Sequence, residues 1–253
     1  MSDEGTSTSA LSDGGTSTPG SDPMTLRRYL TFDDAHGTGK LFLKLEVPTS
    51  AEHLSARRVT GTIYLHTDGR DVILEIGNLI ADVVDRTVRG IRGTPAYIQE
   101  VMHKHLGGIN QYVEDGGKRC NADVSDYFLK MYTEHGDPRP AFAANAQALQ
   151  ADKVMYIEEF QLHRNYHSRG LGELALRILH HTMYNLPAEF AFRGTVVLAP
   201  ISMDAGPVPN QDQYEVEMRL VRFYQKCGYT VWYEEEGREI HQRIMGRTLP
   251  PWF

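Results

Sequence analysis

The chain has 253 residues, of which 41% are hydrophobic, and its formal net charge is −7 at pH 7. This length and composition suit one sizeable core and do not require a second. The negative charge argues against a general nucleic-acid binder. The two cysteines lack metal-type spacing, and no apolar run is long enough for a membrane helix. We therefore expect a cytoplasmic protein, with a nuclear location left open, that binds neither nucleic acid nor membrane.

The chain divides into a tail and one domain. Residues 1–24 are rich in Ser, Thr and Gly and have almost no large apolar side chain, so we expect a disordered tail. Residues 25–253 are expected to form the domain. Lys40–Val47 alternates apolar and polar residues, as a half-buried strand does. Val59–His66 leads through a Thr-Asp-Gly turn into Asp71–Ile76, which is typical of a hairpin.

Two helices are predicted between residues 77 and 150. The first has Thr94-Pro95 at its start and Gly107-Gly108 at its end. The second is predicted over Val124–His135, with an apolar face formed by Val124, Phe128, Met131 and Tyr132.

The most informative stretch runs from Val154 to His181. Val154–Leu162 is rich in β-branched, aromatic and long apolar residues, which predicts a strand, and the polar run His163–Ser168 predicts a turn. Beyond it, apolar residues recur at helical spacing, namely Leu171, Leu174, Ala175, Ile178, Leu179 and Thr182. Gly170 and Gly172 therefore lie at a helix N-terminus. Free N–H groups and the helix dipole favour an anion there, and the absence of Cβ atoms lets a pyrophosphate approach.

A second motif follows at Glu215–Tyr233. Val216, Leu220, Phe223 and Tyr224 share one helical face, Gly228 is placed to end the helix, and Tyr229–Tyr233 predicts a strand. Between the two motifs, Gly194–Leu198 predicts a short buried strand.

Two C-terminal segments have no regular pattern. Ile201–Gln213 contains two prolines and a glycine and predicts a long loop. Glu239–Phe253 leans basic and ends in Pro-Pro-Trp-Phe, whose aromatic residues are expected to pack on the domain.

Together, the two motifs resemble the GNAT acetyltransferases. That family's best-known motif is Gln or Arg, two residues, Gly, one residue, and Gly or Ala; residues 167–172 of this chain are HSRGLG, with His167 at the first position. The family phrase "fYeklGF" is matched by FYQKCGY at residues 223–229. Glu217 and Leu220 stand where the family often has Asn and Ala. The resemblance covers Val154 to Tyr233.

The resemblance implies an α/β fold in which helices flank a mixed, mostly antiparallel sheet. It also implies transfer of an acetyl group from acetyl-CoA to a primary amine of a small molecule or protein, by direct attack in a ternary complex. Residues 77–150 would then be a family-specific insertion or helices of the acceptor site. Pyrophosphate would bind the glycine loop and pantetheine the central strand, so the implied cofactor-binding residues are Phe160, Gln161, Leu162, His167, Ser168, Arg169, Gly170, Leu171, Gly172 and Glu173.

The resemblance also implies catalytic residues. Tyr224 matches the phenolic acid that returns a proton to the leaving thiolate. Glu158 is the preferred general base, followed by Tyr156 and Glu159, with a water relay as the alternative. Strand alternation places Tyr156 and Glu158 on one face and Glu159 on the other, unless a bulge intervenes. No metal site is assigned, because the histidines lack acidic or sulfur partners at ligand spacing.

Two other functions stay open. One is a non-catalytic acyl-CoA-binding or regulatory module on the same fold, which the departures at His167, Glu217 and Leu220 would allow. The other is a dinucleotide-dependent oxidoreductase, because Gly170–Ala175 also satisfies G-x-G-x-x-[G/A]. The polar run before these glycines, and the lack of a suitably placed acid after them, disfavour that second alternative.

Overall fold

The computed structural model of the protein describes residues 23–49, 55–69, 71–89, 95–102, 122–201, 210–235 and 242–249. The predictions of a disordered tail, of a helix end at the 107–108 glycine pair and of a packed aromatic C-terminus lie outside these ranges. In the described ranges, no helix combines the length and hydropathy needed to cross a membrane.

Four antiparallel strands form the first half of the sheet. They are β1 (Met24–Asp34), β2 (Gly37–Val47), β3 (Ala56–Thr67) and β4 (Ile73–Asp85), each paired with the next. In β2 the apolar side chains at alternate positions from Leu41 to Val47 are buried, and those between them are half-buried. The predicted strands and hairpin are confirmed. β4 continues past Ile76 to Asp85, so the start of the segment 77–150 belongs to the sheet.

The second half of the sheet begins at β5 (Lys153–Leu162), which pairs antiparallel with β4 and parallel with β6 (Thr195–Leu198). β8 (Gln242–Thr248) lies between β6 and β7 (Thr230–Glu235), antiparallel to both. The strand order is β1-β2-β3-β4-β5-β6-β8-β7, so the predicted mixed, mostly antiparallel sheet is confirmed. β8 lies within the segment Glu239–Phe253, for which no strand was predicted from the sequence.

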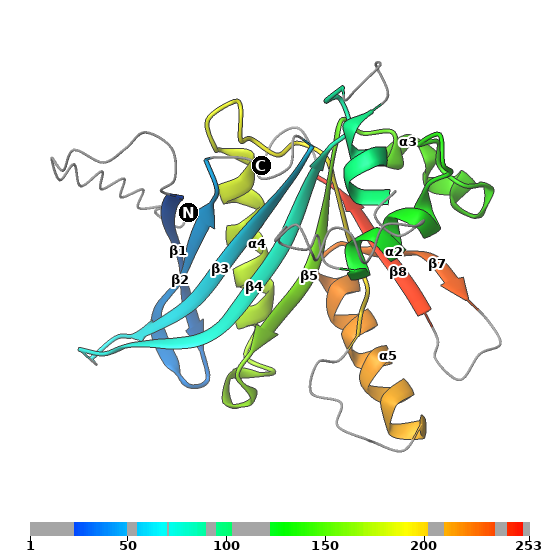
Figure 1. The fold of residues 1–253 in the computed structure, drawn as a ribbon. Helices are drawn as coiled ribbons and strands as arrows, with labels where there is room; N and C mark the ends of the chain where they lie inside the picture. Colours follow the sequence, from blue (N-terminus) through cyan, green and yellow to red (C-terminus); the bar gives the residue numbers. More distant parts are fainter. Residues whose placement is uncertain are drawn as a thin grey trace, which may run out of the picture.

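Helices cover both faces of the sheet (Figure 1). α4 (Leu171–Tyr184) and α5 (Asn210–Lys226) pack on the face that holds the larger core. α2 (Ala122–Met131) covers a second core on the other face, and it ends four residues before the predicted His135. The four apolar side chains predicted to point inward from this helix are fully buried. The short helices are η2 (Ile98–Met102), η4 (Pro140–Asn145), α3 (Ala146–Leu149) and η5 (Arg164–Tyr166).

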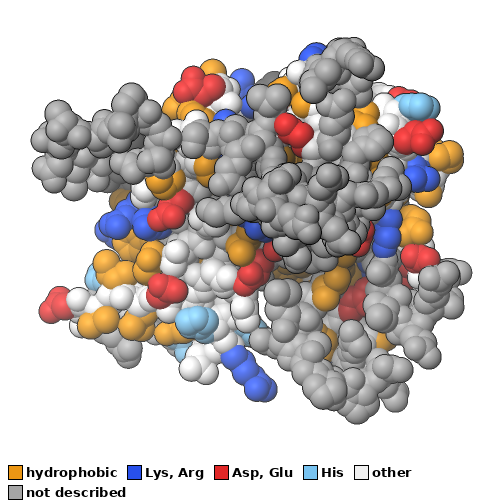
Figure 2. Space-filling view, in the orientation of Figure 1, with side chains coloured by type: hydrophobic (Ala, Val, Ile, Leu, Met, Phe, Trp, Pro, Cys, Tyr) orange, Lys and Arg blue, Asp and Glu red, His pale blue; other side chains and the backbone are white. Residues whose placement is uncertain are grey.

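The described surface mixes charges of both signs. Figure 2 shows acidic and basic side chains interspersed over the visible face, and hydrophobic side chains at the end of the sheet where β3 leads into β4. Val72, Ile73 and Leu74 at this end are among the exposed large hydrophobic residues. Charges that bear on function are therefore expected in small local clusters and not in one extended patch of a single sign.

Candidate functional site

β5 separates from β6 halfway along its length. The two strands pair only from Val154 opposite Thr195 to Ile157 opposite Leu198. Beyond that point β5 remains paired with β4 as far as Leu162. Because alternate residues of a strand direct their N–H and C=O groups to opposite sides, part of the backbone over Glu158–Leu162 is directed away from β4, on the side that β6 has left. Figure 1 shows β5 diverging from β8 and β7, with α5 near the opening.

The loop after β5 leads into an uncapped helix N-terminus. Gly170 is the N-cap residue of α4 in the left-handed conformation (φ 75°), and no side chain caps the helix. The first intrahelical bond runs from Leu174 N to Gly170 O (3.2 Å), so the N–H groups of Leu171, Gly172 and Glu173 have no acceptor within the helix. A Cβ at Gly170 would meet no atom within 4 Å, so the space beside the helix end is open. Backbone donors and a positive dipole end fit a phosphate.

Two side chains of the phosphate motif are already engaged. His167 Nε2 lies 2.8 Å from Leu162 O, which ties the loop to the end of β5. Arg169 donates to Asp34 from Nε (2.9 Å) and Nη2 (3.3 Å), linking the loop to the end of β1. Burial acts to raise the pKa of Asp34, but the hydrogen bond from Arg169, the backbone hydrogen bond from His36 and the charges of these two residues together outweigh it and lower that pKa. What this helix N-terminus offers an anion is therefore a set of backbone donors, while Arg169 is held to one side by Asp34.

α5 joins this loop to the open half of β5. The Phe223 ring stacks nearly parallel on Phe160, with centroids 6.3 Å apart. A Cβ at Gly172 would lie 3.1 Å from the Phe223 ring, so this glycine lets α5 approach the start of α4 closely. The Phe223 ring of α5 thus contacts β5 in its divergent half and also approaches the N-terminus of α4.

Tyr224 lies in the larger core, 7% exposed. Its ring packs edge-on against Phe223 (5.0 Å between centroids) and Tyr229 (5.7 Å). Burial raises the pKa of the phenol, and Cys227 adds to the shift. The hydroxyl therefore stays protonated at neutral pH, as a proton donor must.

A β-bulge changes which carboxylates of β5 share a face. Ile80 pairs with Glu159 and Ala81 with Ile157, so Glu158 is the extra residue. β4 has no extra residue, so the side chains of Ile80 and Asp82, two positions apart, lie on the same face. Their partners on β5, Glu159 and Tyr156, therefore also lie on one face. Asn78 Nδ2 donates to Glu159, while Tyr156 stacks on Tyr127 of α2 (5.0 Å). The bulge thus removes the expected separation of Glu159 from Tyr156.

The sequence analysis missed two charged residues beside Glu158. Arg58 Nη2 contacts Glu158 Oε2 and lies 3.7 Å from Asp82 Oδ2. Asp82 Oδ2 is buried without a hydrogen-bond partner. Burial raises the pKa of the Asp82 carboxyl to about 6; the Arg58 charge opposes the shift and Glu158 adds to it. The sequence feature that could have indicated Asp82 is its position as the one acidic residue in the otherwise apolar run Leu79–Val84, within a buried strand.

The predicted residues come together at the divergent half of β5, although they approach from different sides. The implied phosphate residues lie at its end, and Phe160–Leu162 lie within it. Tyr224 lies on the face covered by α4 and α5, and Tyr156, Glu158 and Glu159 lie on the face covered by α2. The edge of β5 that β6 leaves borders both of these faces.

Comparison with known proteins finds likeness in structure and none in sequence. No family model matches the sequence, and no curated protein matches it. Among solved structures, the chain is similar to a protein of the yellow fever mosquito Aedes aegypti described as arylalkylamine N-acetyltransferase 7. The sequence identity is 11% and the TM-score 0.34, and the match covers 90% of this chain and 96% of that one.

Proposed function

We propose that this protein is an N-acyltransferase of the GNAT type, which moves an acetyl group from acetyl-CoA to a primary amine. The observation that carries the proposal is the separation of β5 from β6 after Ile157, directly before a loop that ends at an uncapped helix N-terminus. An extended chain with amide groups can pair with β5 along the edge where its pairing with β6 has ended, and a pyrophosphate joined to it can bind the N–H groups of Leu171, Gly172 and Glu173.

The residues present fit such a ligand. The donors at the start of α4 are backbone N–H groups, and the free side of β5 offers further backbone groups. When bound, acetyl-CoA would supply an acetyl group activated as a thioester. In the reaction the ammonium first loses a proton, the amine nitrogen bonds to the carbonyl carbon and the carbon–sulfur bond breaks. The nitrogen loses a second proton as the amide forms, so that of the two protons one ends on the thiolate and one passes to solvent.

The protein has a candidate group for each proton transfer. The Asp82–Glu158 pair is suited to accept the ammonium proton, because the pKa of Asp82 is raised to about 6, near the physiological range where a general base is effective. Tyr224 is the candidate that returns a proton to the thiolate; burial raises the pKa of its phenol, which makes it a weaker acid than a free phenol, so the transfer depends on contact with the thiolate in the bound complex. Arg58 positions the two carboxylates by contacting both.

The direct test has two parts. Calorimetric titration should give micromolar binding of acetyl-CoA and none of NAD. A thiol-release assay over a panel of primary amines, including arylalkylamines, polyamines and peptides with free N-termini or lysines, should then identify an acceptor. Binding of NAD alone would sink the proposal.

A variant pair tests the helix N-terminus. Glu173 is exposed in the first turn of α4, where its N–H has no intrahelical acceptor and proline is tolerated. Because the preceding residue is Gly172, which has no Cβ, the constraint from proline on that residue is small. Glu173→Pro should weaken acetyl-CoA binding about tenfold relative to Glu173→Ala, since both lose the carboxylate and only one loses the donor. Equal affinities would place the phosphate elsewhere.

Two observations favour a second candidate, a non-catalytic acyl-CoA-binding module on the same fold. Arg169 is paired with Asp34 and not directed to a phosphate, and Tyr224 is buried in the core. This candidate predicts the same acetyl-CoA titration and the same response to Glu173→Pro. It differs in showing no thiol release with any amine, so the two assays together separate the candidates.

A further inference from the structure

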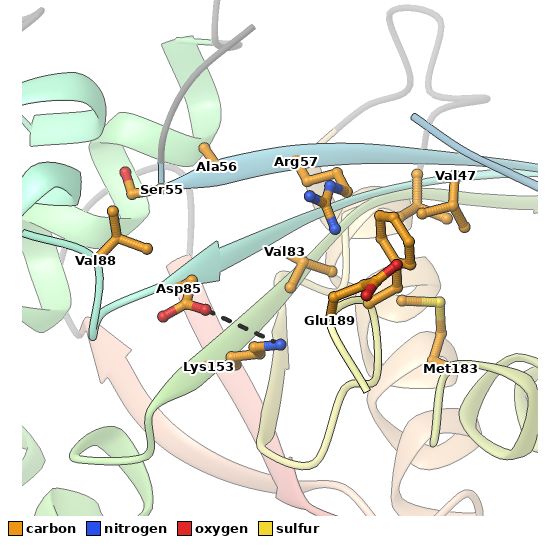
Figure 3. A pocket seen from close by; sticks show the side chains of 12 residues that line it. Val47, Ser55, Ala56, Arg57, Val83, Asp85, Val88, Lys153, Met183 and Glu189 are labelled. Carbon is orange, nitrogen blue, oxygen red and sulfur yellow. Dashed lines mark ion pairs between the residues drawn. The ribbon is translucent and has the colours of Figure 1, made fainter. Parts of the chain in front are cut away.

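A cavity of about 180 Å³ lies at the opposite end of β5 from the divergence. It opens between the ends of β3, β4 and β5 and the segment that follows α4 (Figure 3). Its apolar wall is formed by Val47, Val59, Val83, Val88, Met183 and Phe190. Nine residue steps along β5 separate Lys153 in this cavity from Leu162, which is about 30 Å. The cavity is therefore separate from the candidate acyl-CoA site.

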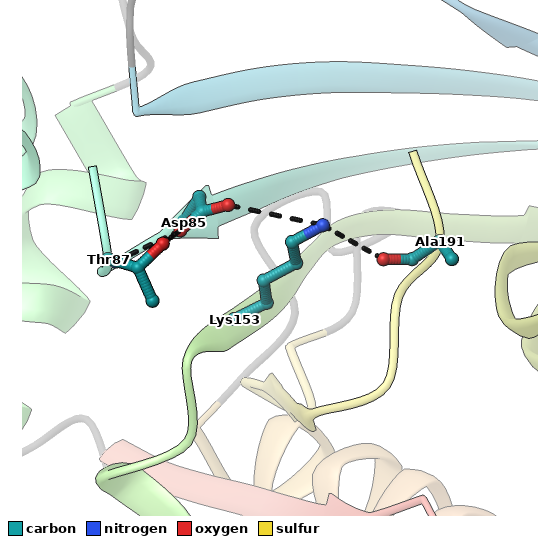
Figure 4. Close-up of polar contacts among 4 residues, drawn as sticks. All are labelled: Asp85, Thr87, Lys153 and Ala191. Carbon is teal, nitrogen blue, oxygen red and sulfur yellow. Dashed lines mark hydrogen bonds and ion pairs between the residues drawn. The ribbon is translucent and has the colours of Figure 1, made fainter. Parts of the chain in front are cut away.

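Two of its four charged side chains are fixed by the protein itself. Asp85 Oδ1 accepts hydrogen bonds from the backbone N (2.9 Å) and Oγ1 (2.6 Å) of Thr87. Lys153 Nζ donates to Ala191 O (2.9 Å) and lies 3.9 Å from Asp85 Oδ2 (Figure 4). Asp85 and Lys153 thus balance one another's charge at the floor of the cavity.

Arg57 differs from these two. Its guanidinium carbon lies 4.5 Å from the centroid of the Phe190 ring, and its Nε is buried without a hydrogen-bond partner. Among the residues that the structure describes, no ion pair to Arg57 is formed. Burial lowers its pKa, while the charges of Asp85 and Glu189 act in the opposite direction. The cavity therefore holds a flat cation, stacked on an aromatic ring, whose buried donor has no acceptor.

The shape and charge of the cavity define the ligand class. A guanidinium presents parallel N–H donors that match the two oxygens of a carboxylate or phosphate. The acids Asp85 and Glu189 disfavour a dianion such as phosphate, and the apolar wall favours a ligand with a hydrophobic body. An apolar cavity of about 150 Å³ can hold benzene, so this volume suits a body of that size.

We propose that this cavity binds a small monocarboxylate with an aromatic or branched aliphatic body. The carboxylate lies on the guanidinium of Arg57, and the body packs against Phe190, Met183 and the valines. This site does not depend on the proposed acyl transfer, and it uses none of the residues assigned to that reaction.

The test uses the full chain and three probes of one shape, namely benzoate, benzamide and benzylamine. Benzoate should bind with a dissociation constant of about 1 mM or tighter and shift the NMR signals of the Met183 methyl and the Phe190 ring. Neutral benzamide should bind at least about tenfold more weakly, because it offers one uncharged acceptor oxygen in place of a carboxylate, and benzylamine more weakly still, because its ammonium offers no acceptor and repels Arg57. Equal binding of benzoate and benzamide, or no shift at Met183 and Phe190, would overturn the proposal.

Two variants and one competition complete the test. Arg57→Gln should lose at least about tenfold in benzoate affinity, and Arg57→Lys should lose less, because it keeps the charge without the paired donors. Acetyl-CoA should not displace benzoate, since the two sites lie at opposite ends of β5. Displacement, or unchanged benzoate affinity in Arg57→Gln, would show that benzoate occupies another site. The comparison of the three probes needs no variant, so it decides the question even if Arg57→Gln fails to fold.

Discussion

The two halves of β5 differ in both sequence and environment. Val154–Ile157 is paired on both sides, by β4 and β6, and its side chains are at most 4% exposed. Glu158–Gln161 is paired on one side, and its side chains are half-buried. The inner half therefore stabilises the sheet, whereas the outer half has backbone and side chains to offer a ligand. The change in pairing occurs at the bulge at Glu158.

The first way to sharpen this comparison is to truncate one side chain in each half. Met155→Ala should cost about 2–5 kcal/mol in the free energy of unfolding, because Met155 is fully buried. Phe160→Ala should cost less, because its ring is half-exposed, but it should weaken acetyl-CoA binding. Urea denaturation and calorimetry on both variants measure the two effects. If Met155→Ala weakened binding as much as Phe160→Ala, the division between the halves would be wrong.

The second prediction removes the proton donor beside the outer half. Tyr224→Phe should lower kcat about a hundredfold with little change in acetyl-CoA affinity, since only the hydroxyl is lost. Tyr229→Phe is the matched control: its ring lies in the same core, and its hydroxyl bonds to His180 (3.0 Å). The control should lose stability and keep kcat. A fully active Tyr224→Phe protein would leave Tyr224 as a core residue.

The third prediction concerns the acids at the bulge. Because the folded pKa of Asp82 is raised to about 6 from 3.8, the folded state holds this proton more tightly, and the resulting stability is lost as pH rises through about 6. Asp82→Asn lacks this dependence. As the pH rises from 4 to 7, the unaltered protein should therefore lose about 1–3 kcal/mol of unfolding free energy relative to the variant.

Urea denaturation at both pH values measures this difference. In a Glu158→Gln background this loss should shrink, because one charge that raises the pKa of Asp82 is gone. A difference that stays constant from pH 4 to pH 7 would show that Asp82 does not hold the proton.

The smallest expected effect is at the far end of the outer half. Asp34→Asn should release Arg169 to contact a phosphate and tighten acetyl-CoA binding about two- to fivefold. The gain is small because Arg169 would exchange one partly exposed charge pair, with Asp34, for another, with the phosphate. Calorimetry on this variant and on Arg169→Gln measures the change. Weaker binding by Asp34→Asn would mean that the ion pair positions the loop and does not compete with the ligand.

The local features of this fold were predictable from sequence. Helical and strand periodicity located β5, α4 and the helix that ends at Gly228, whose φ of 84° suits the end of a helix. The glycines at 170 and 172 indicated the open helix N-terminus, because their role depends on backbone conformation and not on distant contacts.

The features that were missed depend on contacts between distant residues. Arg58 and Asp82 meet through the register of β3 and β4, which periodicity does not fix. β8 contains Arg243, which resembles a surface residue in the sequence but is buried by pairing with Glu217 (2.7 Å) and Glu234. Glu217 was counted only as a departure from the family pattern. In the structure it ties α5 to β8.

The position of β8 has a consequence for biosynthesis. β7 is made before β8 but joins the sheet only through it, because β8 lies between β6 and β7. A nascent chain that has reached Glu235 therefore has β6 with an open edge and β7 with no partner strand, and such edges can pair with other chains. Once the seven residues from Gln242 to Thr248 are available to fold, their pairing as β8 covers the edge of β6 and joins β7 to the sheet.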